Sequence, residues 1–442
     1  MSIVPEPLRI AAFRSFWLAR LTTTIAQMAM VIVIGWQVYD IARQTMEVDE
    51  AAFQLGLIGL VQFVPLFALT PISGWVADRL DRRHVGRAVV ILEMTCALIL
   101  FWATWGGRVS LPILFAVAAL LGVARAFAGP ALGALAPNLV PRKLLPRAIA
   151  LSSIAWQSGA ILGPALGGIL YDITPHLSYG VSAALFAFAA GCLFMIGPVP
   201  RTTIEPGKPI QRMVEGLQYV GRNRLVLGAI TLDLFAVLLG GATAMLPVYA
   251  RDILHVGAQG LGPLRAAPAL GATLTAIFFS FQPIKTDVGV KMLSAVVVFG
   301  AATAVFGFST WFWLSLAMLA LLGAADMFSV YIRQSLIQLH TPDAMRGRVA
   351  AASTLAISAS NELGEARSGF AAAWIGPVAA TIGGGIAAIV VTLLWARLFP
   401  ELRRAAPSIP PTSRLLKKLR WFRAACDGLQ KAISRTMCAA HP

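Results

Sequence analysis

Ionisable side chains stand within long apolar segments of this chain, and they are the residues best placed to do chemistry. Four acids in such segments are candidates for binding protons: Asp233, Asp326, Glu362 and Glu365. Burying an ionised carboxylate in an apolar environment is costly, so an acid held there can take up and release a proton near neutral pH. Each of these acids equally suits a structural ion pair, and the sequence leaves both interpretations open.

The surroundings of each acid bear on this choice. Asp233 has no charged residue within seven positions on either side, which favours a proton site. Asp326 stands seven positions before Arg333, two helical turns away, so the two suit an ion pair on one helix face. Glu362 and Glu365, at i and i+3, also share a face. Two carboxylates that close favour one bound proton, unless arginines from neighbouring segments clamp them.

Basic, amide and aromatic residues in the apolar segments are candidates for binding an organic substrate: Arg125, Arg265, Trp36, Gln37, Phe127 and Phe328. The two arginines can attract an anionic or catecholate group, or neutralise the buried acids. The aromatic residues can form a wall for a ring-bearing substrate. Tryptophan near the end of a segment is also typical of a membrane-interface anchor, an alternative that stays open for Trp36.

The composition requires a membrane around these residues. The chain has 442 residues, of which 58% are hydrophobic and 13% charged. Apolar runs longer than about 18 residues recur throughout, and each is long enough to cross a bilayer as a helix. The runs lack the alternation of a transmembrane barrel. We therefore expect an all-α polytopic membrane protein with twelve transmembrane helices in two pseudo-symmetric six-helix halves.

The net charge of +16 does not indicate nucleic-acid binding, because the basic residues are sorted by side. With the N-terminus inside, only Arg43, Arg108 and Arg251 fall on the outer side. This asymmetry follows the positive-inside rule and predicts that both termini are cytoplasmic. A fifth acid, Glu93, is placed near the cytoplasmic end of its segment, and we expect its side chain to reach that end.

The chain divides at a polar stretch into two similar parts. We predict a six-helix half over residues 1–200, a cytoplasmic linker over 201–225, a second half over 226–400 and a basic tail over 401–442. An offset of 201 residues relates Gly163 to Gly364 and Arg125 to Asp326, so Arg125 also suits a pair with Asp326 across the repeat. Repeats of this kind place a substrate site at their interface. Residues 413–435 form a basic amphipathic segment that suits anionic lipid headgroups, or a partly disordered tail.

A charged loop between two apolar segments resembles the loop signature of the major facilitator superfamily of transporters. Its matching residues are Gly74, Asp78, Arg79, Arg82 and Arg83. In that superfamily the loop acts as a cytoplasmic gate that holds the two halves together. The match departs at Asp81, where the family pattern usually has glycine. An ordinary charged loop is the alternative.

A second motif resembles the fifth-helix pattern of proton-coupled drug exporters in the same superfamily. It consists of Gly159, Gly163, Pro164, Gly167 and Gly168. Glycines four residues apart make a flat stripe on a helix, and the proline bends that helix, so the resemblance implies a hinge in an exporter. Close packing between helices without a role in transport is the alternative.

Over roughly residues 10–400 the chain resembles the branch that contains bacterial enterobactin (siderophore) exporters. Three stretches carry this resemblance: Leu246–Asp252, Thr341–Arg348 and Ser360–Glu365. It implies a bacterial inner-membrane efflux carrier for a siderophore or for multiple drugs, driven by proton antiport. The alternative is a membrane sensor or scaffold that kept the fold without transporting.

Enzyme chemistry has no support in the sequence. The five histidines fall in loops or in the tail, and no HExxH, GxSxG or GxxxxGK[ST] string occurs. The four cysteines show no metal-ligand spacing. We expect no enzymatic activity, no metal and no cofactor. The expected partners are a small-molecule substrate, protons and membrane lipid.

Overall fold

The computed structural model describes residues 5–133, 135, 138–198, 209–281, 286–342 and 345–404. Twelve long helical segments dominate this part, and no strand occurs in it. The first half contains α2 (Ala11–Ala42), α3 (Val48–Arg79), α4 (Arg82–Trp105), α5 (Leu111–Gly133), α6 (Leu145–Ile173) and α7 (Pro175–Phe194). The second half contains α9 (Arg224–Gly240), α11 (Gly257–Phe281), α12 (Val288–Phe308), α13 (Phe312–His340), α14 (Arg346–Ile375) and α15 (Pro377–Leu398).

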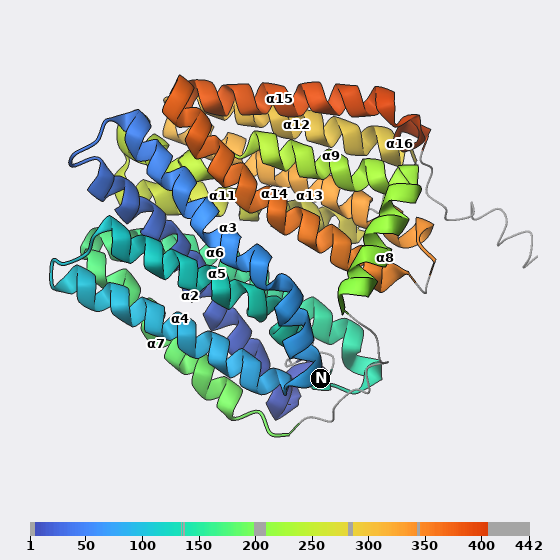
Figure 1. Cartoon of the computed structure of the whole chain (residues 1–442), viewed down its shortest axis with the longest axis horizontal. Coiled ribbons are helices and arrows are strands. Elements are labelled where there is room, and N and C mark those ends of the chain that lie inside the picture. The colour runs from blue at the N-terminus through green and yellow to red at the C-terminus, as the bar shows by residue number, and fades with distance from the viewer. Residues whose placement is uncertain are drawn as a thin grey trace, which may run out of the picture.

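Short elements connect or precede these helices. They are α1 (Glu6–Arg9), η2 (Arg142–Leu144), α8 (Pro209–Arg222), η3 (Thr243–Met245), α10 (Leu246–Val248), the π-helical turn η4 (Tyr249–Ile253) and α16 (Pro400–Arg404). In Figure 1 the N-terminus, α8 and α16 lie toward one end of the bundle, here named the linker end. The opposite end, which carries the turn between α2 and α3, is named the far end.

Eleven segments of the described chain are long and apolar enough to cross a membrane. The exception among the long helices is α14, whose serines, glutamates and arginines lower its hydropathy. At 30 residues it is about 45 Å long, more than a bilayer core requires. It packs between α3, α9 and α15, so its polar side chains face protein more than lipid. The prediction of an all-α polytopic membrane protein is confirmed.

The same neighbour pattern repeats in both halves. In the first, α2 packs against α6 and α7, α3 against α5, and α4 against α5 and α7. In the second, α9 packs against α14 and α15, α11 against α13, and α12 against α13 and α15. Helices α6 and α14 begin at residues 145 and 346, which reproduces the offset of 201 seen in the sequence. The exact domain boundaries stay a prediction.

The two halves meet along two helix pairs, α3 with α14 and α6 with α11. Glycines permit these close crossings. Gly56 lies against Gly369 at the first crossing, and Gly168 lies against Gly262 and Ala258 at the second. A methyl group added at Gly168 would lie 2.5 Å from the Ala258 carbonyl oxygen, so any larger residue must push the halves apart.

The seventh membrane segment is not one continuous helix. Helix α9 ends at Gly240, and the chain then proceeds through η3, α10 and the π-turn η4. A break inside a membrane leaves backbone groups in need of partners. The hydroxyl of Ser368 on α14 donates to the Gly241 carbonyl oxygen at 2.7 Å and satisfies one of them.

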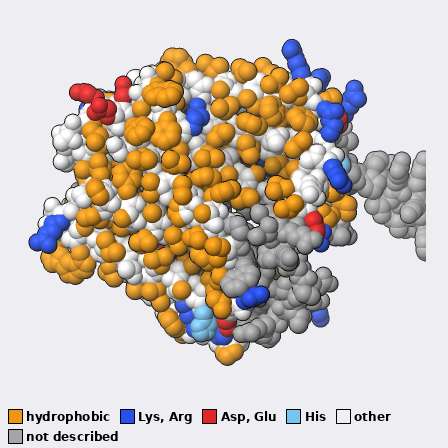
Figure 2. All heavy atoms as spheres, viewed as in Figure 1, with side chains coloured by type: hydrophobic (Ala, Val, Ile, Leu, Met, Phe, Trp, Pro, Cys, Tyr) orange, Lys and Arg blue, Asp and Glu red, His pale blue; other side chains and the backbone are white. Residues whose placement is uncertain are grey.

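The surface of the molecule agrees with a membrane location. Figure 2 shows hydrophobic side chains over the broad middle of one face, with most charged side chains gathered at the two ends. Helix α8 lies within the predicted linker. It docks on the second half, where Glu215 pairs with Arg348 at 2.6 Å and the Tyr219 hydroxyl donates to the His340 carbonyl oxygen at 3.0 Å.

Candidate transport site between the two halves

An ion pair joins the two halves near the middle of the bundle. A guanidinium nitrogen of Arg125 on α5 lies 2.7 Å from a carboxylate oxygen of Glu362 on α14. Arg125 also donates to the side-chain oxygen of Gln62 on α3 at 3.3 Å. The Arg125 side chain is 43% exposed and that of Glu362 only 6%. Arg125 therefore faces open space at the interface between the two halves, which is here named the seam. Its acidic partner Glu362 is buried.

A second pair stands beside the first. Arg265 on α11 lies 3.5 Å from Glu365, one helical turn along α14 from Glu362. The structure thus brings together four of the predicted site residues, and with Gln62 they form what is here named the seam cluster: Gln62, Arg125, Arg265, Glu362 and Glu365. The cluster balances two acids with two bases. Polar groups at this depth in a membrane protein are costly and mark substrate or ion pathways.

The other two predicted proton sites lie together inside the second half. Asp233 on α9 forms an ion pair with Arg333 on α13, and both side chains are almost fully buried. The sequence favoured a pair between Arg333 and Asp326 on the same helix, but in the structure Arg333 pairs with Asp233 on α9. Asp326 stands beside this pair and lines a small cavity with Asp233 and Ser329. Asp233, Asp326 and Arg333 are here named the second-half triad.

The structure does not bring the predicted aromatic wall together. Trp36 is buried, and Gln37 accepts from the Tyr179 hydroxyl at 2.7 Å and donates to Thr104 at 3.3 Å, all within the first half. Phe328 instead packs against Phe279 with ring centroids 4.9 Å apart. Within the described residues, no ring contact joins Phe127 to Trp36 or to Phe328. The side chains of Trp36 and Gln37 are both buried, and a role for them in substrate binding stays a prediction.

The expectation for Glu93 is wrong. It stands 11 residues into α4, near the middle of that helix, and its side chain is 1% exposed, so it cannot reach the cytoplasmic end. One carboxylate oxygen accepts from the Gln27 side chain on α2 at 2.5 Å, and the other has no hydrogen-bond partner. Helix α4 begins at Arg82, which places Glu93 about 17 Å along the helix from that end.

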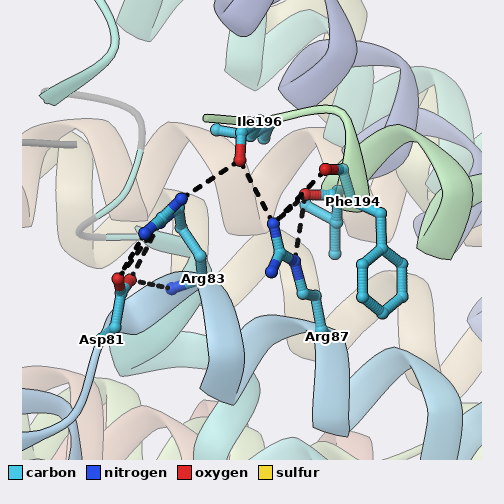
Figure 3. Close-up of polar contacts among 6 residues, drawn as sticks. Asp81, Arg83, Arg87, Phe194 and Ile196 are labelled. Carbon is cyan, nitrogen blue, oxygen red and sulfur yellow. Dashed lines mark hydrogen bonds and ion pairs between the residues drawn. The ribbon is translucent and has the colours of Figure 1, made fainter. Parts of the chain in front are cut away.

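The loop signature lies at the linker end, where Gly74 and Asp78 fall outside the side chains that the structure describes. Arg79 and Arg82 take part in interactions there. Figure 3 shows that Arg83 reaches Asp81 at 2.6 Å and the Ile196 carbonyl oxygen at 3.2 Å. Arg83 therefore connects α4 to the end of α7 within the first half, and its role in a gate between the halves stays a prediction.

Asp81, the departure from the family pattern, has a structural role. It is the N-cap of α4 and accepts from the Arg83 backbone N–H at 3.0 Å. Hydrogen bonding to the Arg83 guanidinium lowers the pKa of Asp81 to about 2. Because the folded-state pKa is lowered, this stabilisation is present above the ordinary aspartate value and is lost as pH falls toward 2. Nearby, Arg87 donates to the Leu193 and Ile196 carbonyl oxygens (Figure 3).

The glycine motif on α6 divides between two neighbours. Gly159, Gly163 and Gly167 face α2, where an added methyl group would meet Thr24, Ile25 or Ala29 at 2.6 to 3.0 Å. Gly168 faces α11 of the other half. Pro164 is buried within α6, and its carbonyl oxygen lies close to Gly262. The stripe therefore fixes α6 within the first half, and its last glycine forms the seam.

Polar contacts that sequence reasoning missed close the far end. Arg43 pairs with Asp252 at 3.5 Å, and Arg251 pairs with Asp40. Each half thus supplies one acid and one base, and both ion pairs join the two halves. The Tyr39 hydroxyl also donates to Asp252 at 2.5 Å. These five residues are here named the far-end latch. The opposite charges at the ends of the first and seventh segments were a signal for it.

The described residues hold no group of three or more His, Cys, Asp or Glu side chains that could bind a metal ion. A model of the Major Facilitator Superfamily matches residues 16–365. The chain belongs to this superfamily. Members of it are transporters, so the protein is a membrane transporter and not an enzyme.

Relatives of this chain include proteins named as exporters. The enterobactin exporter EntS of Citrobacter koseri is 27% identical over 406 residues, covering 90% of this chain and 95% of the relative. The protein of the same name from Escherichia coli is 25% identical over 404 residues, covering 90% and 94%.

Solved structures show the same fold at lower identity. A bacterial homolog of the human lysosomal transporter Spinster, inward-facing and unoccupied, matches with a TM-score of 0.66 at 16% identity, covering 91% of this chain and 98% of that one. The POT family transporter PepTSo matches with a TM-score of 0.69 at 12% identity, covering 90% and 99%.

Proposed function

We propose that this protein exports a small amphipathic molecule, a siderophore or a drug, across the bacterial inner membrane by proton antiport. The distribution of Lys and Arg along the sequence supports a cytoplasmic linker end, with both termini on that side. The far-end latch then closes the periplasmic side. A substrate enters from the cytoplasm while the latch is closed and leaves after the halves have rocked to open it.

The observation that carries this proposal is the ion pair between Arg125 and Glu362. It joins the two halves at mid-depth, and Arg125 is the exposed member. An anionic or catecholate group that binds Arg125 competes with Glu362, so substrate binding weakens a contact between the halves. Arg265 offers a second basic group close by. This arrangement couples occupancy of the site to movement of the halves, as alternating access requires.

Proton coupling is assigned to acids in the seam cluster and the second-half triad. The triad has two carboxyl groups and one guanidinium, and Asp233 already pairs with Arg333. An unpaired carboxylate at that depth is costly, which favours a proton on Asp326. When a substrate binds Arg125 or Arg265, Glu362 or Glu365 loses its ion-pair partner. Each of these acids can then take up a proton for the same reason. Lipid binding through residues 413–435 lies outside the described part of the chain and stays a prediction.

Flux in proteoliposomes tests this function. Purified protein is reconstituted, a pH gradient is imposed, and the movement of a catecholate siderophore and of a cationic dye is followed separately. We expect gradient-driven movement of one of them, abolished by a protonophore and reduced at least tenfold in Arg125→Gln. Folded protein that moves neither compound, with or without a gradient, would instead support the sensor or scaffold alternative.

A further inference from the structure

Glu93 is a buried acid that the proposed cycle does not use. Its side chain is 1% exposed, in the middle of a membrane helix. One oxygen has a single neutral donor, the amide of Gln27, and the other has no hydrogen-bond partner. An ionised carboxylate in an apolar interior needs cations or several donors, and one amide does not meet that need. A protonated carboxyl group fits this environment.

The charged and titratable groups around Glu93 leave one cation to consider. Arg125 stands on α5, which packs against α4, and its positive charge acts on Glu93. On α2, Arg20 stands seven residues before Gln27, about 10 Å nearer the linker end. Cys96 lies on α4 itself, three residues after Glu93.

The remaining helix that packs along α4 is α7. Its titratable side chains lie at other heights along the bundle than Glu93. His176 packs against Phe101, and the Tyr179 hydroxyl donates to Gln37, both toward the far end. Cys192 stands beside Leu193, whose carbonyl oxygen accepts from Arg87, about 9 Å along α4 from Glu93. Arg125 is therefore the cation available to an ionised Glu93.

Arg125 is engaged elsewhere in this conformation. It pairs with Glu362 of the other half at 2.7 Å. We propose that Glu93 is a proton-binding residue of the first half, and that it shares Arg125 with Glu362. While Glu93 carries its proton it is neutral, and Arg125 stays on Glu362. When the proton leaves to water at the exposed seam, the buried carboxylate attracts Arg125, and the contact between the halves weakens.

This inference deepens the proposed antiport and rests on it for its place in the cycle. It assigns the coupling to one arginine with two carboxyl partners on opposite halves. The half-buried Gln27 donates to Glu93, and its amide holds the acid in place without neutralising it. In this arrangement the proton binds to Glu93 in the first half, whereas the second-half triad lies wholly in the second half.

Infrared difference spectroscopy on protein in nanodiscs tests the protonation directly. A pH step should reveal the carbonyl stretch of a protonated carboxylic acid that disappears in Glu93→Gln and persists in the matched control Glu365→Gln. Gln27→Leu keeps the acid but removes its donor, and should shift that band in frequency. The same band in wild type and Glu93→Gln, or no shift in Gln27→Leu, would overturn the proposal.

Transport measurements then test the sharing of Arg125. In Glu93→Gln, gradient-driven flux should fall to the level seen without a gradient, while substrate exchange at equal pH persists. Substrate affinity in wild type should change by up to about tenfold per pH unit for one linked proton, and by less than about twofold in the variant. A wild-type response to the gradient in Glu93→Gln overturns the coupling role. Absence of flux in wild type, with the infrared band present, would refute the antiport and not the proton on Glu93.

Discussion

Buried charges in this protein find partners that are distant in the sequence. Asp233 and Arg333 are 100 residues apart, and their side chains are 8% and 2% exposed. Removing one member of such a pair leaves an uncompensated charge and destabilises a fold by about 3–5 kcal/mol. The second-half triad adds an asymmetry, because Asp326 is a second acid beside the single base.

That asymmetry predicts unequal effects of removing the acid and the base. Asp233→Asn leaves Arg333 with Asp326 seven residues away on the same helix, so we expect only about 1–2 kcal/mol of destabilisation. Arg333→Gln leaves two acids without a base, and we expect about 3–5 kcal/mol. Thermal unfolding in detergent measures both, with the double variant recovering part of the loss. Equal destabilisation by the two single variants would show that Asp326 does not replace Asp233 as the partner of Arg333.

The sequence predicted the charged residues of both polar clusters, but neither Gln62 nor the pairs within the clusters. Asp326 and Arg333 share a helix face at i and i+7, which favoured a pair between them. The choice of Asp233 depends on how α9 packs on α13, which no periodicity within one helix reveals. Glu93 was misplaced for a similar reason, since the depth of a side chain depends on where its helix begins.

At the scale of the elements, glycines allow the helices at the seam to pack closely against each other. Gly56 with Gly369 and Gly168 with Gly262 form two crossings related by the internal repeat, one on each side of the seam. Because backbone meets backbone there, the halves can pivot on these crossings without interlocking side chains.

Alanine at the seam tests this arrangement. In Gly168→Ala the new methyl group meets the Ala258 carbonyl oxygen at 2.5 Å. We expect about 1–3 kcal/mol of destabilisation from the forced separation, and several-fold slower transport. Gly191→Ala is the matched control, since nothing lies within 4 Å of its added methyl group. It should be neutral or stabilising by up to about 1 kcal/mol. Similar losses in both variants would mean that the seam is not tight.

The glycine stripe was predictable as a packing surface, because glycines four residues apart must share a face. Its partner was not. Three of its glycines contact α2 of the same half, and only Gly168 contacts the other half. Neighbouring positions on one helix face can point into different interfaces when that helix is wedged between two others.

Across the whole molecule, the far-end latch holds the two halves through exchanged charges. Asp40 and Arg43 stand one turn apart on one half, and Arg251 and Asp252 are adjacent on the other. Each pair is only partly exposed, so both pairs together oppose separation more than a surface ion pair does.

Charge exchange across the latch predicts its role. Arg251→Asp places acids opposite Asp40, so we expect the far end to open, while the double variant Asp40→Arg with Arg251→Asp restores closure. Distances between spin labels at Gln44 and His255 report the opening. The single variant should lengthen them and the double variant should return them. Unchanged distances in the single variant would show that other contacts close this end.

At this scale the sequence predicts most of the architecture, because span length, hydropathy and the positive-inside rule are local properties. The order of helices and their repetition follow from these. The charge at the ends of the spans could have indicated the latch, but its pairing depends on the packing of the halves. The interruption after Gly240 also escaped prediction, because Gly240 and Gly241 stand within an uninterrupted apolar run.

That interruption has a consequence for biogenesis. Helix α9 has 17 residues and is about 25 Å long, whereas the hydrocarbon core is about 30 Å thick. The remaining depth is crossed by η3, α10 and η4, and the carbonyl oxygen of Gly241 accepts from the hydroxyl of Ser368, which is synthesised 127 residues later. The seventh span therefore stays incomplete until α14 has entered the membrane. In the described part of the first half, each of the six long helices is continuous and needs no partner of this kind, so these helices can assemble as they leave the ribosome.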